Sequence, residues 1–158
     1  MKSVDNLKVK DIMIKEVIFV FPETDIREAA ALIKNHRIHG LPVVKEKKVV
    51  GIVTRTDFFT RGLSNFHLPS YINFMQGIKE TSNVEKEIQK NSKIKKFLNI
   101  KIKDIMTEKC FTVNPEMMIK ELFEIFSKTE WQSFPVTNKS GTLIGIVTLI
   151  DIIKLLKI

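Results

Sequence analysis

Cysteine is almost absent from this sequence of 158 residues, since Cys110 is the only one. A single cysteine cannot form an internal disulfide, which favours a reducing compartment, and we expect a cytoplasmic protein. No apolar run approaches the roughly 18 residues of a membrane-spanning helix. The first residues, MKSVDNLKVKDIM, lack the apolar stretch of a signal peptide. We therefore expect no membrane association.

The residue patterns of catalysis and metal binding are also missing. His36, His39 and His67 have no metal-ligand spacing, and Cys110 has no evident base partner. There is no glycine-rich phosphate loop such as GxxxxGK. We therefore expect no enzyme, no catalytic residue, no metal and no required cofactor.

Arginine is scarce although the formal net charge is +8, because the chain has 22 Lys and only 4 Arg. A basic balance favours anionic partners. Arginine, however, is the preferred side chain for reading guanine edges, so its scarcity argues against sequence-specific DNA binding, and we do not expect nucleic acid as a partner. With 44% apolar and 28% charged residues the composition is ordinary for a soluble globular protein.

One sequence unit is present twice. KVKDIM at 8–13 aligns with KIKDIM at 101–106 when the chain is shifted by 93 positions. GIVTRTD at 51–57 aligns with GIVTLID at 145–151 at a shift of 94. So many identities in one order indicate an internal duplication covering about 8–62 and 101–158.

Each copy has the residue pattern of a β-α-β-β-α unit. A short β-type run precedes a proline, an amphipathic helix follows, and two strands lead into a second helix. A unit of about 50 residues buries too little surface to be stable alone. We therefore predict an α+β fold in which two tandem repeats pack through their sheets as a pseudo-twofold pair.

We divide the chain into repeat 1 with the N-terminal segment (1–62), a helical linker (63–100) and repeat 2 (101–158). The linker is polar and rich in lysine. A lysine run is usually a solvated face, so we expect its helix to pack on the repeats. The alternative is a basic arm for nucleic acid, made of Lys93, Lys95, Lys96, Lys101 and Lys103.

The repeated Thr-x-x-Asp motif has two interpretations. The first is a capping box, in which the Thr54 hydroxyl accepts from the Asp57 amide while the Asp57 carboxylate reaches back to the Thr54 amide. The second is a ligand site, because a helix N-terminus suits phosphate and a carboxylate can accept both hydroxyls of a ribose. The two are compatible, since the threonine can cap while the aspartate binds.

The ordered motif set KVKDIM…IHGLPVV…VVGIVTRTD, with its second copy KIKDIM…FPV…LIGIVTLID, resembles the CBS domain. The resemblance covers about 110 residues. It implies a tandem pair, called a Bateman module, that binds an adenosine-containing ligand (AMP, ADP, ATP or S-adenosylmethionine) and regulates a partner protein. It also implies a homodimer, and it raises the ligand interpretation of Thr-x-x-Asp above the cap alone.

The resemblance implies two clefts that each draw on both repeats. In the first, we expect Ile52, Thr54, Arg55, Thr56, Asp57, Cys110, Phe111, Gln132, Ser133 and Pro135. In the second, we expect Val17, Ile18, His39, Pro42, Ile146, Thr148 and Asp151.

The two clefts are not equivalent. Relatives often carry Thr or Ser before the Asp, which fits Thr56, whereas Ile150 weakens the polar part of the second cleft. Arg55 is suited to a phosphate or is simply solvated, and His39 is a phosphate-region donor or a surface residue.

Three functions remain open from the sequence. The first is a stand-alone regulatory module that senses an adenine nucleotide. The second is an interaction and dimerisation scaffold whose Thr-x-x-Asp motifs only cap helices. The third is a nucleic-acid-associated regulator that uses the lysine-rich linker.

Overall fold

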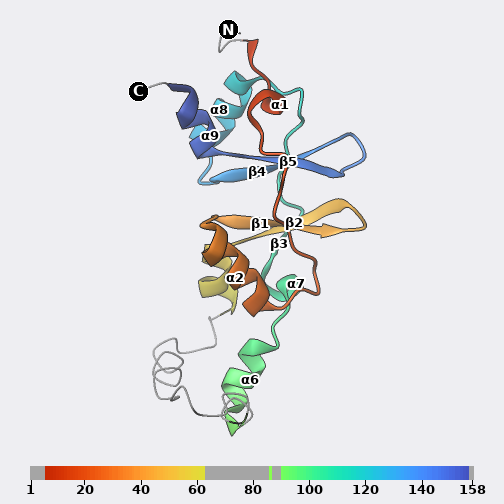
Figure 1. Cartoon of the computed structure of the whole chain (residues 1–158), viewed down its shortest axis with the longest axis vertical. Helices are drawn as coiled ribbons and strands as arrows, with labels where there is room; N and C mark the ends of the chain where they lie inside the picture. The colour runs from red at the N-terminus through yellow and green to blue at the C-terminus, as the bar shows by residue number, and fades with distance from the viewer. Residues whose placement is uncertain (1–5, 63–85, 87–89, 157–158) are drawn as a thin grey trace.

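The computed structural model describes residues 6–62, 86 and 90–156. Most of the linker, with His67, lies outside the described residues. Within the described part, the linker contributes α6 (Ser92–Leu98), which extends from the lower end of the molecule in Figure 1. Ile94 and Leu98 of α6 are buried.

The two repeats form two stacked halves whose sheets face each other (Figure 1). Each half has a helix, an antiparallel hairpin and a short closing helix on its own side. The first half contains α2 (Ile26–His36), β1 (Gly40–Lys45), β2 (Lys48–Thr54), α3 (Arg55–Asp57) and the π-helical η2 (Phe58–Gly62). The second half contains α8 (Ile119–Lys128), β4 (Ser133–Thr137), β5 (Leu143–Thr148), α9 (Leu149–Ile153) and the 3₁₀-helical η3 (Lys154–Leu156). The predicted paired α+β architecture is confirmed.

The first segment of each repeat packs into the other repeat. Helix α1 (Val9–Ile12) contributes Val9 to the core of the second half, beside α8. Helix α7 (Ile102–Ile105) contributes Ile102 and Ile105 to the core of the first half. The short β3 (Thr107–Glu108) then pairs with β2. Each half is therefore completed by residues from the other repeat.

The predicted first strand of each repeat forms only a single bridge. Val20 pairs with Val43 and Val113 pairs with Val136, each in parallel. Each valine donates its amide to one residue of the neighbouring strand and accepts with its carbonyl oxygen from the residue two further along. The pairing does not continue beyond these two bonds. The extended runs at 17–21 and 110–114 are therefore connections with one buried valine each, rather than strands.

The two sheets are tied together at their hairpin turns. The Leu143 amide donates to the Lys47 carbonyl oxygen at 3.2 Å, and the Val49 amide donates to the Gly141 carbonyl oxygen at 3.1 Å. At the first turn Glu46 and Lys47 have positive φ angles of 50° and 68°. The relative position of the repeats, and of any groove between them, is therefore set by backbone bonds.

Two of the lysines proposed as a nucleic-acid arm are paired within the chain. Lys103 Nζ lies 2.7 Å from Glu23 Oε1, and Lys101 Nζ lies 3.8 Å from Asp25 Oδ2. Both acids precede α2 in the first repeat. Their positions make Lys101 and Lys103 part of the contact between the repeats.

Candidate functional site

The Thr-x-x-Asp motif of the first repeat joins β2 to α3. The Thr54 amide and hydroxyl both donate to Asp57 Oδ2, at 2.8 and 2.9 Å. The carboxylate half of the predicted capping box is therefore present. The hydroxyl of Thr54 donates to the carboxylate and so fixes the side chain of Asp57. Asp57 is also buried, at 7% exposed.

The second motif has the same arrangement between β5 and α9. The Thr148 amide and hydroxyl donate to Asp151 Oδ2 at 2.9 and 2.7 Å, and Asp151 is also 7% exposed. Here the Asp151 amide also donates to the Thr148 hydroxyl oxygen, at 3.3 Å. In both repeats the cap uses one carboxylate oxygen, so the other is available for a further contact.

That second oxygen faces a cation in each repeat, but the two cations differ in position. Lys154 Nζ lies 3.3 Å from Asp151 Oδ1. Arg61 Nε lies 3.8 Å from Asp57 Oδ1, and Arg61 also donates from Nη1 to the Met106 carbonyl oxygen at 2.8 Å. Arg61 is thus tied to the segment after α7, whereas Lys154 lines a cleft.

A cleft of about 320 Å³, which we call cleft 1, opens beside Asp57. Both repeats line it, because the start of β4 lies opposite the end of β2. Its residues from repeat 1 are His39, Ile52, Thr54, Arg55, Thr56 and Asp57, and those from repeat 2 are Thr107, Glu130, Trp131, Gln132 and Ser133.

A larger cleft of about 630 Å³, cleft 2, opens beside Asp151. It also has walls from both repeats. Repeat 1 contributes Ile14, Glu16, Val17, Ile18, His36, Arg37, Ile38, His39 and Gly40, and repeat 2 contributes Gln132, Ser133, Ile146, Thr148, Leu149, Ile150, Asp151 and Lys154.

Most of the predicted site residues line the cleft to which the sequence assigned them, but four do not line either cleft. Pro42 and Pro135 are buried within β1 and β4, two residues beyond the cleft-lining Gly40 and Ser133. Because side chains on one face of a strand recur every second residue, each proline lies further along the sheet than the cleft. Phe111 packs edge-on against Phe134 with ring centroids 5.7 Å apart, and Cys110 is half-buried. Neither residue is among those that line the two clefts.

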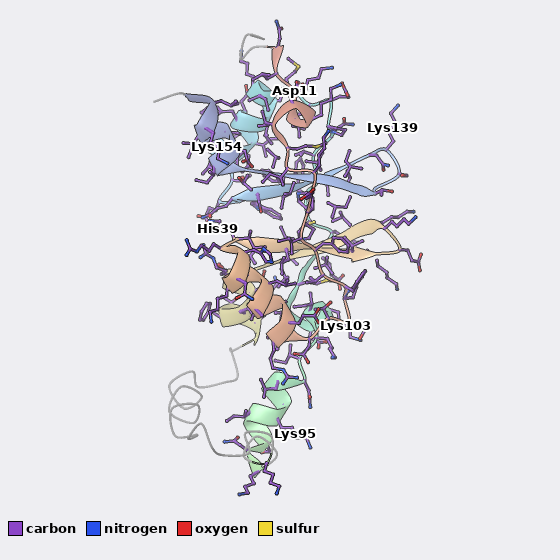
Figure 2. All side chains as sticks on the ribbon, viewed as in Figure 1. Asp11, His39, Lys95, Lys103, Lys139 and Lys154 are labelled. Atoms are coloured by element: carbon purple, nitrogen blue, oxygen red, sulfur yellow. The ribbon has the colours of Figure 1, made fainter. Side chains whose placement is uncertain are left out.

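His39, Gln132 and Ser133 line both clefts. The sequence had assigned His39 to the second cleft alone, and the other two residues to the first cleft alone. Arg55 lies in cleft 1, and its Nη2 contacts Nδ1 of His39. A guanidinium has no acceptor, so it donates and the histidine nitrogen accepts. The turn at His39, which Figure 2 labels, is a wall shared by the two sites.

Several charged wall residues were missed by the sequence analysis. Arg37 and Glu130 occupy equivalent positions in the repeats, 93 residues apart, at the ends of α2 and α8. Arg37 caps α2 in the left-handed conformation with φ 53°. The alignment of the repeats shows that a positive residue in repeat 1 stands where repeat 2 has a negative one. It does not show that the turn after each helix brings that side chain to a cleft.

Trp131 stacks on Phe134, with ring centroids 5.9 Å apart and an interplanar angle of 7°. It is half-buried against the core of the second half and also borders cleft 1. Trp131 is therefore a packed wall of that cleft.

Within the described residues, no three His, Cys, Asp or Glu side chains gather as metal ligands would. The helices in this part of the chain are also all too short or too polar to cross a bilayer.

The chain matches the CBS domain over residues 9–63 and 102–158. A relative from Methanocaldococcus jannaschii, the uncharacterized protein MJ1426, is 31% identical over 154 residues, which cover 94% of this chain and 90% of that protein. The inosine-5′-monophosphate dehydrogenase of Korarchaeum cryptofilum is 31% identical over 145 residues. The match covers 92% of this chain but only 23% of that enzyme.

Solved structures show the same fold. The CBS domain pair of protein MJ0100, in complex with 5′-methylthioadenosine and S-adenosyl-L-methionine, has a TM-score of 0.70 at 25% identity and covers 96% of this chain and 97% of its own. CBSX2 in complex with AMP has a TM-score of 0.69 at 22% identity, and the match covers 95% of this chain and 96% of CBSX2. The duplicated motifs, the paired halves and these matches agree, and the chain belongs to the CBS domain family, with two copies of the domain in tandem.

Proposed function

We propose that this protein is a regulatory module that binds an adenosine-containing ligand, AMP, ADP or ATP, in the clefts between its repeats and signals the bound state to a partner protein. The observation that carries the proposal is the buried aspartate beside each cleft. The cap occupies Oδ2 of Asp57 and of Asp151, whereas Oδ1 contacts the exposed cation Arg61 or Lys154 and can accept a further donor. A ribose diol supplies two hydroxyl donors to such a carboxylate.

The rest of each cleft suits the remaining parts of an adenosine ligand. Ile52 in cleft 1 and Val17, Ile18 and Ile146 in cleft 2 offer apolar surface for an adenine ring. Arg55 in cleft 1 and Lys154 in cleft 2 are cations suited to an anionic group. The adenosine ligands of the MJ0100 and CBSX2 complexes support the same class of ligand for this chain.

Signalling requires that the ligand bind one conformation more tightly than another, because equal affinity for both shifts nothing. Both clefts lie between the two repeats, so a ligand that contacts both walls favours one relative position of the halves. We propose that this position is what a cytoplasmic partner protein recognises.

A homodimer is part of the proposal. The closing helices of the two repeats expose large apolar side chains that a second copy would cover. These are Phe59 at 60% and Ile153 at 45% exposed, which line neither cleft. Sedimentation equilibrium of the full chain should give twice the mass of one chain, 18.3 kDa, and a strictly monomeric protein would contradict the dimer.

Titration calorimetry against AMP, ADP, ATP and S-adenosylmethionine tests the ligand. We expect an adenine nucleotide to bind, and to stabilise the fold by about 2.7 kcal/mol at 100 times its dissociation constant. Asp57→Ala and Asp151→Ala should weaken binding, whereas Lys139→Ala at a hairpin turn should not. If S-adenosylmethionine alone bound tightly, it would be the ligand and the proposal of an adenine nucleotide would be wrong.

Other outcomes of the same experiment identify the competing functions. A flat titration with every adenosine compound at millimolar concentration, together with lower ligand-free stability of Asp57→Ala, would indicate a scaffold with purely structural caps. Binding of nucleic acid that falls steeply with salt, and that disappears with Lys95→Ala and Lys96→Ala, would indicate a nucleic-acid-associated regulator.

A further inference from the structure

The two clefts carry opposite charges at positions that the duplication makes equivalent. We propose that cleft 2 takes the adenosine ligand that carries phosphate, and that cleft 1 takes an adenosine compound without phosphate. This inference rests on the proposed function of the clefts and assigns each of them a ligand class.

The strongest difference lies at the ends of the two long helices. Arg37 ends α2 and lines cleft 2, while its equivalent Glu130 follows α8 and lines cleft 1. Both side chains are exposed. A guanidinium offers several donors to a phosphate, whereas a carboxylate at the same place repels it.

The second difference lies in the closing turns. Lys154 lines cleft 2 and lies 3.3 Å from Asp151 Oδ1. The equivalent position in repeat 1 is Thr60, which donates to the Thr56 carbonyl oxygen at 3.1 Å and is absent from the wall of cleft 1. A phosphate-bearing ligand in cleft 2 therefore meets the Lys154 ammonium beside Asp151, whereas the cation beside Asp57, Arg61, does not line cleft 1.

Size favours the same assignment. Ligand pockets usually have volumes of about 300–1,000 Å³. Cleft 1, at about 320 Å³, is near the lower limit, whereas cleft 2, at about 630 Å³, has twice the space. A nucleoside suits the smaller cleft, and a nucleotide with its phosphate and bound water suits the larger one.

Two differences act in the other direction. Glu16 adds a carboxylate to the wall of cleft 2, and its equivalent in repeat 2, Lys109, lines neither cleft. Arg55 lines cleft 1, where the equivalent position in cleft 2 is Leu149. Nη2 of Arg55, however, is already used by His39. Arg55 also shares the wall of cleft 1 with two carboxylates, Asp57 and Glu130, so it balances part of their charge and the wall stays acidic.

Calorimetric titration of the full chain with AMP and with adenosine, which differ only in the phosphate, tests the assignment. Asp151→Asn should abolish AMP binding and leave adenosine binding, and Asp57→Asn should do the reverse. Asparagine keeps an amide oxygen for the cap, and thermal melting shows whether each variant folds.

A charge exchange at the two exposed positions tests the same idea without touching the caps. Arg37→Glu should weaken AMP binding by roughly fivefold or more, the size expected for a partly exposed charge contact. Glu130→Arg should add a second AMP site to the stoichiometry. The matched charge reversal Lys139→Glu, at the hairpin end away from Lys154 in Figure 2, should change neither value.

The outcomes separate this inference from the function on which it rests. Loss of AMP binding in Asp57→Asn but not in Asp151→Asn, or equal AMP affinity of wild type and Arg37→Glu, would overturn the assignment while the clefts still bind ligand. If wild type bound neither AMP nor adenosine, the proposed function would fall, and the assignment with it.

Discussion

The backbone amide of Val9 donates to the carbonyl oxygen of Met117 at 2.9 Å, so the start of the first repeat is bonded into the second. The reciprocal bond joins the Ile102 amide to the Thr24 carbonyl oxygen at 3.0 Å. Val9 and Ile102 are both fully buried, each in the core of the other half. The two halves therefore share their cores as well as their clefts.

Shortening one exchanged side chain should destabilise the protein strongly. We expect Ile102→Ala to lower the free energy of unfolding by about 2–5 kcal/mol, because it leaves a cavity in a packed core. Urea denaturation measures the change. Ile150→Ala, at a side chain that is 52% exposed, is the matched control and should cost less than about 0.5 kcal/mol. Equal effects of the two changes would contradict the exchange.

This exchange is the part of the fold that the sequence could not predict. Periodicity and proline positions define local elements, and the duplication defines the paired halves. The segments KVKDIM and KIKDIM are nearly identical, however, so each carries the same apolar pattern for either core. Only the path of the chain between the halves decides which core each one enters.

The candidate site was predictable to a similar degree. The Thr-x-x-Asp motifs identify the wall around Asp57 and Asp151, because strand end and helix start are adjacent in the chain. The charged residues Arg37 and Lys154 depend on a left-handed turn and on a side chain reaching back by one helical turn. Neither geometry has a distinct sequence signal beyond the comparison of the two repeats.

The threonine caps should stabilise the protein without any ligand. Thr148→Ala removes a hydroxyl that donates to Asp151 Oδ2 at 2.7 Å and accepts from the Asp151 amide at 3.3 Å. We expect a loss of about 1 kcal/mol in the free energy of unfolding, while Thr148→Ser, which keeps the hydroxyl, should lose less. A ligand-free melting curve for each variant gives the comparison. Identical curves for the Ala and Ser variants would refute the capping role.

The thiol of Cys110 should react slowly near neutral pH. Burial raises the pKa of Cys110 from 9.0 to about 11, and the thiolate is the reactive form. The rate of alkylation by iodoacetamide should therefore stay low until the pH approaches the raised pKa, and urea-unfolded protein should react faster at pH 8. Equal rates for folded and unfolded protein would rule out the burial.

The same shift has a consequence for stability in alkali. The unfolded thiol loses its proton at a lower pH than the folded one, so the folded state binds more protons between the two pKa values. Stability from this group is complete below pH 9.0 and decreases as the pH rises toward about 11. Cys110→Ser should melt with a smaller pH dependence in that range, and an unchanged profile would contradict the burial of the thiol.

Acid should weaken the contact between the N-terminal segment and the second repeat. Hydrogen bonds from Lys10 and Lys8 hold the pKa of Glu116 below its usual value of 4.5. A lowered pKa in the folded state gives stability above the unfolded pKa, which is lost as the pH falls through the folded value. Melting temperatures from pH 7 to pH 3 should decrease less in Glu116→Gln than in wild type, with Glu124→Gln as the control. The effect should be small, because Glu116 is exposed, and parallel curves would contradict it.

A crystal structure of the full chain grown with AMP tests the central claim most directly. The account predicts AMP between the two repeats, with its ribose hydroxyls within hydrogen-bonding distance of the free oxygen of a Thr-x-x-Asp carboxylate. AMP bound on an outer surface of the molecule, with both Asp57 and Asp151 free of ligand, would contradict it.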